Sequence, residues 1–166
     1  MADKARGMVS MTPTVTVTAD ADSDAVDVIH HDIKKTLGGK LEYEKEDETI
    51  KWYYSEAHDV TSNADLLTAS NSFTDGSGSI ATDDHVKFIF VKNTGKTDTG
   101  ETTSATLCLT TNGTNPASGS NALAMGPGES IILKFRTRQD VTSLHGASTS
   151  GTIRAIVAAL IEDESA

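Results

Sequence analysis

Three apolar runs separated by turn-rich polar segments constrain the fold of this chain more than any other feature. The runs are His85–Lys92, Ala105–Thr111 and Ser130–Phe135. Short apolar runs that alternate in polarity and are bounded by polar turns are typical of antiparallel strands. Thr and Ser are also abundant, and Thr suits a half-exposed pleated surface. The sequence therefore predicts an all-β protein built on an antiparallel sheet.

The first run predicts a central strand. Strict alternation divides it between two faces, one with Val86, Phe88 and Phe90, the other with Lys87, Ile89 and Val91. Because both faces are largely apolar, we expect this strand to be buried on both sides. The segment that follows begins with Asn93-Thr94-Gly95 and continues with polar residues, so it is predicted to be an exposed loop.

Two further strands are predicted nearer the amino terminus. Lys40–Glu44 and Ile50–Tyr54 both alternate in polarity and are separated by an acidic turn, which predicts a hairpin with one exposed face. The polar segment Thr61–Asp83 is predicted to be a long crossover. It is anchored by isolated apolar residues, namely Leu66, Leu67, Phe73 and Ile80.

The last apolar run, Thr152–Ile161, fits a helical stripe and a strand face equally well. Its β-branched residues, the preceding turn and the neighbouring β-patterns favour a final, centrally placed strand. In total, about seven or eight short strands with long loops predict an antiparallel β-sandwich that is jelly-roll-like. We expect a single domain over residues 25–166, preceded by an extended arm over residues 1–24.

The arm holds one alternating segment, made of Thr14, Val15, Thr16, Val17 and Thr18. An acidic stretch follows it, in which Asp20, Asp22 and Asp24 have the spacing of the first ligands of a calcium loop. That loop needs Gly at its sixth position and Glu at its twelfth, where this chain has Ala25 and His31. The acidic stretch is therefore predicted to be a solvated linker.

Charge and cysteine content exclude several classes of protein. The chain has 14 Lys and Arg against 24 Asp and Glu, a formal net charge of −10, which argues against nucleic-acid binding. The single cysteine, Cys108, excludes an internal disulfide and is predicted to be a small buried hydrophobe. There is no signal-peptide pattern and no apolar run of about 20 residues. We therefore expect no membrane span and synthesis in a reducing cytoplasm.

No catalytic, cofactor or metal residues are predicted. The histidines, which show no metal-ligand spacing, are His30, His31, His58, His85 and His145. Gly146-Ala147-Ser148-Thr149-Ser150 lacks the final Gly of a nucleophile elbow. Trp52, Tyr53 and Tyr54 alternate between two faces and are predicted to pack in the core instead of forming a sugar-stacking platform. We therefore expect a protein that is not an enzyme.

The order of three segments resembles a known class of protein. They are Asp84–Gly95, Ala105–Thr110 and Leu123–Ser130. In this order they resemble virion structural proteins of tailed bacteriophages, especially head decoration or cement proteins with a jelly-roll-like fold. The resemblance covers about Asp84–Asp163 and transfers no functional residues.

The resemblance implies a homo-oligomer, with a trimer favoured, that binds the major capsid protein and stabilises the shell from the capsid surface of the virion. We expect the segment Thr14–Thr18 to add as an edge strand to a neighbouring subunit. The alternative is a phage tail or fibre tip domain that binds a host receptor or glycan through its loops. A carbohydrate-binding module or small hydrolase outside a virus is disfavoured, because the sequence shows neither an exposed aromatic row nor a carboxylate pair.

Overall fold

The computed structural model describes residues 4–9, 39–44, 49–74, 76, 78–116 and 122–164. The chain divides into two compact units, Asp3–Glu44 and Lys45–Ala166. The predicted boundary between arm and domain, after residue 24, lies outside the described residues and stays a prediction.

The first unit contains a two-stranded antiparallel sheet. Strand β1 (Lys4–Val9) pairs with β2 (Gly39–Glu44), with Lys4 opposite Glu44 and Val9 opposite Gly39. The predicted hairpin between Lys40–Glu44 and Ile50–Tyr54 is therefore wrong, although both segments are strands. The second segment pairs with the last strand of the chain instead. Proximity in sequence was a poor guide here, because a strand with an apolar face pairs where that face can be buried.

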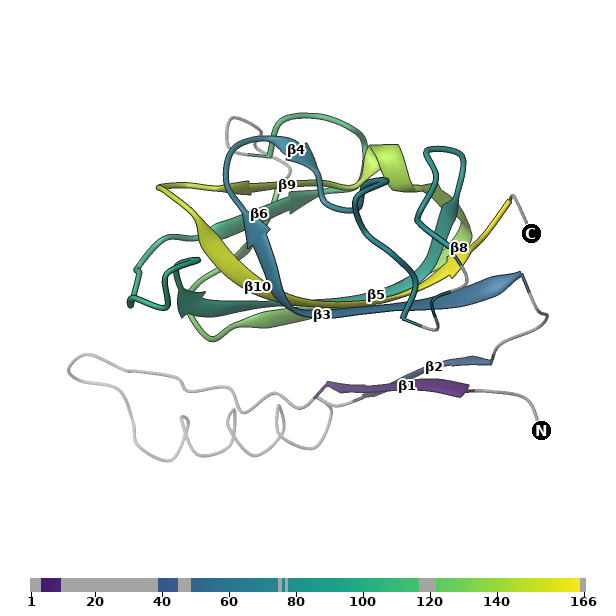
Figure 1. The fold of residues 1–166 in the computed structure, drawn as a ribbon. Coiled ribbons are helices and arrows are strands. Elements are labelled where there is room, and N and C mark those ends of the chain that lie inside the picture. The colour runs from purple at the N-terminus through teal and green to yellow at the C-terminus, as the bar shows by residue number, and fades with distance from the viewer. Residues whose placement is uncertain are drawn as a thin grey trace, which may run out of the picture. The chain divides into compact units, whose positions relative to one another are not determined.

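The second unit is an antiparallel sandwich of two four-stranded sheets (Figure 1). The long sheet has the order β3 (Ile50–Val60), β10 (Ile153–Glu162), β5 (His85–Lys96) and β8 (Ser130–Asp140). The short sheet has the order β4 (Ala64–Asp65), β9 (His145–Ser148), β6 (Leu107–Thr110) and β7 (Leu123–Met125). The 3₁₀-turn η1 (Val141–Ser143) joins β8 to β9. Because the described residues hold no α-helix, the all-β prediction is confirmed.

The pairing order is that of a jelly roll. The first four strands of the sandwich pair with the last four in reverse order: β3 with β10, β4 with β9, β5 with β8, and β6 with β7. This is an antiparallel ribbon folded over on itself, and the contacts of β10 with β5 and of β9 with β6 close the two sheets. The jelly-roll-like sandwich predicted from the sequence is confirmed.

Strand β10 resolves the ambiguity of the last apolar run. It lies inside the long sheet, between β3 and β5, and is buried along most of its length. A strand in this position buries both faces, so it needs a nearly continuous apolar sequence. Such a sequence also matches a helical stripe, which explains why periodicity alone could not decide. The prediction of a final central strand is confirmed.

Strand β5 is central as predicted, but the predicted division of its faces is wrong. Val86, Ile89 and Val91 are fully buried in the core between the sheets, whereas Phe88 does not belong to that core. In the pairing with β10, Phe88 lies opposite Leu160 and Val86 lies opposite Ile161, so Lys87 is an extra residue of β5 and marks a β-bulge. A bulge adds one residue to one strand and so moves every later side chain to the other face.

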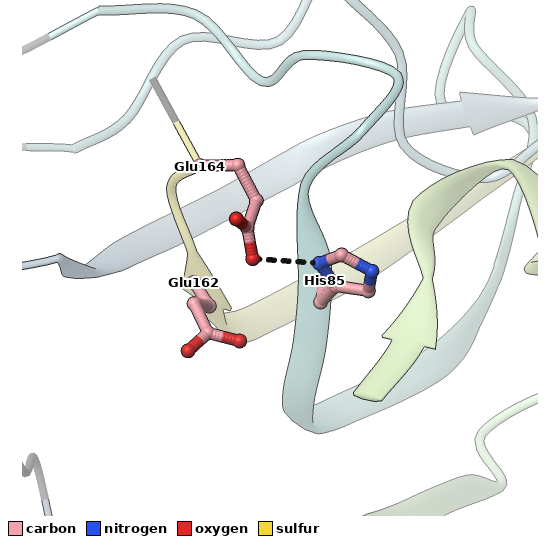
Figure 2. A group of neighbouring side chains, drawn as sticks. All are labelled: His85, Glu162 and Glu164. Carbon is pink, nitrogen blue, oxygen red and sulfur yellow. Dashed lines mark ion pairs between the residues drawn. The ribbon is translucent and has the colours of Figure 1, made fainter. Parts of the chain in front are cut away.

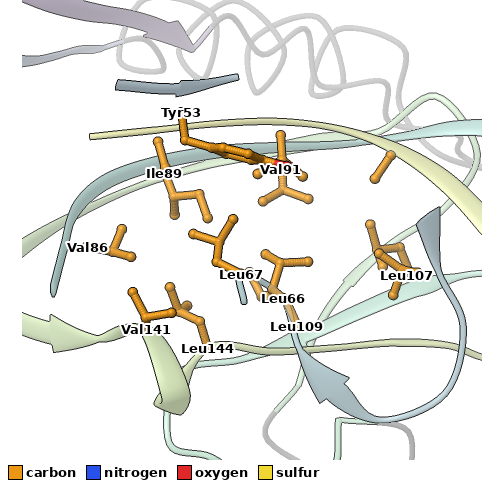
Figure 3. Packing of buried hydrophobic residues seen from close by; sticks show 14 of the residues in the cluster. Tyr53, Leu66, Leu67, Val86, Ile89, Val91, Leu107, Leu109, Val141 and Leu144 are labelled. Atoms are coloured by element: carbon orange, nitrogen blue, oxygen red, sulfur yellow. The ribbon is translucent and has the colours of Figure 1, made fainter. Parts of the chain in front are cut away.

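The core lies between the two sheets (Figure 3). The long sheet contributes residues such as Tyr53, Ile89 and Val91, and the short sheet contributes Leu107 and Leu109. The crossover predicted over Thr61–Asp83 contains β4, and its anchor residues are all buried, as the sequence indicated: Leu66, Leu67, Phe73 and Ile80. An irregular segment thus supplies a substantial part of the core.

The predicted exposed loop after Lys92 begins later than expected. Strand β5 continues to Lys96, and Asn93 is fully buried. Its amide nitrogen Nδ2 donates hydrogen bonds of 3.0 Å each to the carbonyls of Ala105 and Met125. A buried amide persists when its hydrogen bonds are satisfied, so Asn93 joins β5 to the segment before β6 and to the last residue of β7 in the short sheet.

Candidate functional site: the outer face of the long sheet and a polar groove

The face of the long sheet that points away from the core is apolar in its centre. Strand register aligns two rows across it: Trp52, Leu160, Phe88 and Lys134 in one, and Tyr54, Ala158, Phe90 and Ile132 in the other. These eight residues define the outer face. Trp52 and Tyr54 remain 37% and 44% exposed, so the prediction that they pack in the core is wrong. Tyr53 alone points inward.

The β8 edge of this sheet is basic. Lys134, Arg136 and Arg138 alternate along β8, are all exposed, and share the side of the strand opposite the core residues Leu133 and Phe135. The side chains of the outer face therefore change across the sheet, from exposed aromatic residues on β3 to cations on β8. This combination is notable in a chain whose net charge is −10.

A group of charged side chains binds the end of β10 to β5 and β8 (Figure 2). His85 lies between two carboxylates, with Nε2 3.1 Å from Asp140 and Nδ1 3.2 Å from Glu164. Lys87 is 2.7 Å from Glu162, and Arg138 contacts both Glu162 at 3.3 Å and Glu164 at 2.8 Å. Figure 2 shows Glu164 directed at the ring of His85.

Three of these residues have the spacing of a metal site. His85, Glu162 and Glu164 each offer a donor atom within 4.8 Å of the others. The same two carboxylates, however, already bind Lys87 and Arg138, which supply the positive charge that a cation would bring. The arrangement is best explained as an ion-pair network that fastens the last strand to its neighbours.

Asp84 reinforces this junction. Its fully buried carboxylate accepts hydrogen bonds from the backbone N–H of Ala81, at 2.7 Å, and of Glu164, at 3.1 Å. Burial raises the pKa of Asp84, and these two hydrogen bonds oppose that effect. The carboxylate thus ties the start of β5 to the end of β10.

A polar groove of about 340 Å³ lies beside the second half of β3. Its walls are the β3 residues from Ser55 to Asp59 and the segment from Asp65 to Asn71. A smaller hollow of about 60 Å³ adjoins it and shares His58, Asp59, Asp65 and Leu66. Such a groove is not visible as a sequence pattern, because its two walls come from a strand and from an irregular crossover.

Three side chains beneath the groove form a hydrogen-bonded chain. Asn71 accepts the N–H of Thr68 through Oδ1 at 2.8 Å, which fixes its amide, and donates through Nδ2 to the Tyr53 hydroxyl at 3.2 Å. That hydroxyl lies 3.0 Å from Nδ1 of His58, within hydrogen-bond distance. Burial lowers the pKa of His58, against the opposing effects of a hydrogen bond with the Leu66 backbone and the charge of Asp59. A neutral His58 imidazole, whose Nδ1 accepts a hydrogen bond from the Tyr53 hydroxyl, is consistent with this series of hydrogen bonds.

The candidate residues from the sequence lie in separate places. The predicted partner-contact arm, Thr14–Thr18, lies outside the described residues and stays a prediction, as do Asp20, Asp22, Asp24, His30 and His31. His85 belongs to the ion-pair network, and His145 lies 2.9 Å from Asp65. Cys108 is buried, as predicted, and burial raises its pKa. Gly146–Ser148 belongs to β9 and not to a strand-to-helix turn.

Sequence reasoning missed the outer face and Asn93. The outer face depends on the bulge at Lys87, which no residue pattern announces. Asn93 had one available signal: it is followed two residues later by Gly95, whose N–H it binds through Oδ1 at 2.9 Å and whose φ is 70°. An Asn-x-Gly step that ends an apolar strand is typical of such a local turn.

Comparison with known proteins leaves the chain without a family. No protein-family model matches it, and no curated protein or solved structure is significantly similar to it. In the part of the chain that the structure describes, no helix has the length and apolar character needed to cross a membrane.

Proposed function

We propose that this chain is a non-enzymatic virion structural protein, a decoration or cement protein that binds the outer surface of a tailed-phage capsid and stabilises the shell. Its partners would be the major capsid protein and further copies of itself, with a trimer favoured. The observation that carries the proposal is the exposed aromatic pair Trp52 and Tyr54 on the outer face of the four-stranded long sheet.

The composition of that face suits protein adhesion, although its centre is already buried: Phe88, Ala158 and Leu160 are 3%, 8% and 7% exposed. Four strands of about eleven residues span roughly 700 Å² by standard strand rise and spacing, and the exposed parts are the β3 and β8 sides. A typical stable interface buries about 800 Å² on each partner, so these exposed parts would form one portion of a larger interface. Aromatic residues and Arg are the side chains enriched in such interfaces, and both are present here. Burial of apolar area contributes about 25 cal/mol per Å², so each added contact would help to resist outward pressure on the shell.

The acidic charge agrees with a place outside the shell. A net charge of −10 repels packaged DNA, and charges on a decorating protein would face solvent.

Sedimentation with capsid shells that lack the protein tests this proposal. Wild-type protein is expected to pellet with the shells and to saturate. The double variant Trp52→Ser/Tyr54→Ser should bind at least about tenfold more weakly, the size expected when interface anchors are lost. Leu123→Ser is the matched control, because Leu123 is also 37% exposed but lies on β7 of the short sheet. Absence of wild-type binding, or equal binding by the aromatic variant, would contradict the proposal.

A tail or fibre tip domain that binds a host receptor or glycan is the second candidate function. The polar groove favours it, since hydroxyl, amide and carboxylate groups line that groove. Deletion of the protein would then abolish adsorption of the phage to its host while leaving heads intact. A decoration protein would show the reverse, with normal adsorption and less stable heads.

A further inference from the structure

The polar groove beside β3 is a separate surface from the outer face. Its apolar lining residues are Ala57, which is exposed, and Leu66, which is 2% exposed. The polar side chains that line it are Ser55, His58, Asp59, Asp65, Thr68, Ser70 and Asn71. The volume of about 340 Å³ lies within the range of small-ligand sites, roughly 300–1,000 Å³.

The groove wall from Thr68 to Asn71 is held in place before any ligand arrives. Asn71 binds the Thr68 N–H through its side chain, and its backbone N–H donates to the Thr68 carbonyl at 2.8 Å. The Thr68 and Ser70 hydroxyls lie 2.7 Å apart. The Ile80 N–H donates to the Asn71 carbonyl at 2.9 Å, which connects the wall to the core. Little conformational entropy would therefore be lost on binding.

The two carboxylates of the groove have partners and are still accessible. Arg154 binds both oxygens of Asp59, at 3.0 and 3.3 Å, and His145 lies 2.9 Å from one oxygen of Asp65. Each carboxylate accepts more than one hydrogen bond, so lone pairs remain for a ligand. An anionic ligand would meet two carboxylates, and a cationic one would compete with Arg154 for Asp59. Neutral hydroxyl groups meet neither obstacle.

We propose that this groove binds a neutral sugar residue of a glycan. The Asp59 and Asp65 carboxylates accept hydrogen bonds from adjacent sugar hydroxyls, and the Thr68 and Ser70 hydroxyls accept or donate as the ligand requires. The exposed methyl group of Ala57 is the apolar group that can contact the C–H face of the ring. This inference does not rest on the decoration role, since it concerns a different surface.

The test uses the full ¹⁵N-labelled chain titrated with the methyl glycosides of glucose, galactose, mannose and N-acetylglucosamine, followed by NMR. Saturable shifts of amides between residues 55 and 71 are expected with at least one of the four. Asp65→Asn should weaken that binding about tenfold, because a hydrogen bond to a charged group is lost. Ser70→Ala, an exposed change that leaves the Asp65 pair intact, should weaken it severalfold.

Glu101→Gln is the control, since Glu101 is exposed, lies in a loop outside the groove and should leave the shifts unchanged. Absence of saturable shifts with all four glycosides would overturn the proposal. Binding as tight as that of wild type in both Asp65→Asn and Ser70→Ala would also overturn it. Stronger binding of glucose 6-phosphate than of any neutral glycoside would refute the ligand class. Sedimentation of Asp65→Asn with capsid shells separates the two proposals, because shell binding should be unaffected.

Discussion

The two sheets of the sandwich fill their sides of the core in different ways. The long sheet consists of strands of 10 to 12 residues whose own alternation fills one side of the core. The short sheet has strands of 2 to 4 residues, too short to bury much by themselves. Its side of the core is completed by the crossover residues Leu66 and Leu67 and by Val141 and Leu144 at η1. The long sheet is thus specified by pattern, and the short sheet by anchors in irregular segments.

The largest expected effect tests whether irregular anchors matter as much as strands. Leu67 is fully buried in the crossover, so Leu67→Ala should lower the free energy of unfolding by about 2–5 kcal/mol, as for other buried leucines. Val157→Ala in β10, also fully buried, should cost less, about 1–3 kcal/mol, because fewer methyl groups are lost. Urea unfolding measures both. A cost below 1 kcal/mol for Leu67→Ala would show that anchors in irregular segments stabilise the core less than strand residues do.

The next effect concerns the connection between the sheets. Asn93→Ala removes the donor to the carbonyls of Ala105 and Met125 and leaves both in a buried setting. We expect a loss of about 2–3 kcal/mol in denaturant unfolding, since each buried unsatisfied group is costly. Asn112→Ala serves as the control, because Asn112 binds only Thr114 in an exposed turn and its loss should cost well under that. Equal costs would show that Asn93 does not couple the sheets.

A smaller effect is expected at the ion-pair network of the long sheet. Glu162→Gln removes the carboxylate shared by Lys87 and Arg138 and should cost about 1 kcal/mol, in line with partly exposed ion pairs. The difference from wild type should shrink as salt is added, because added ions screen the pairs. A salt-independent difference would indicate that packing, and not charge, holds this end of β10.

The smallest effect is a pH dependence at His58, which lies on β3 of the long sheet beside the crossover. Burial holds its folded pKa below the ordinary value of 6.5, so the unfolded chain binds more protons as pH falls through that value. The stability contributed by neutral His58 is therefore present above pH 6.5 and is lost as the pH falls. Melting temperature should drop less on acidification in His58→Gln than in wild type. An identical drop in both proteins would contradict this assignment.

The fold was largely predictable because its determinants are local patterns. Alternation in His85–Lys92 and Ser130–Phe135 identified two strands of the long sheet, and the apolar Thr152–Ile161 identified its centre. Pairing partners were less accessible: β3 was assigned to its neighbour in sequence but pairs with β10, because antiparallel pairing in a jelly roll is decided over about a hundred residues.

The candidate sites were much harder to predict. The bulge at Lys87 puts Val86 and Phe88 on opposite faces, so the composition of the outer face could not be deduced from alternation. The groove depends on where the crossover places Thr68 and Asn71 against β3, which is a tertiary property. Exposed aromatic residues such as Trp52 also look the same in sequence as buried ones.

The melting temperature of capsid shells, measured with and without saturating amounts of this protein, tests the proposed cement role most directly. The account predicts that decorated shells melt at a higher temperature, and that Trp52→Ser/Tyr54→Ser gives no increase while Leu123→Ser gives the full one. An unchanged melting temperature at saturating wild-type protein would contradict it.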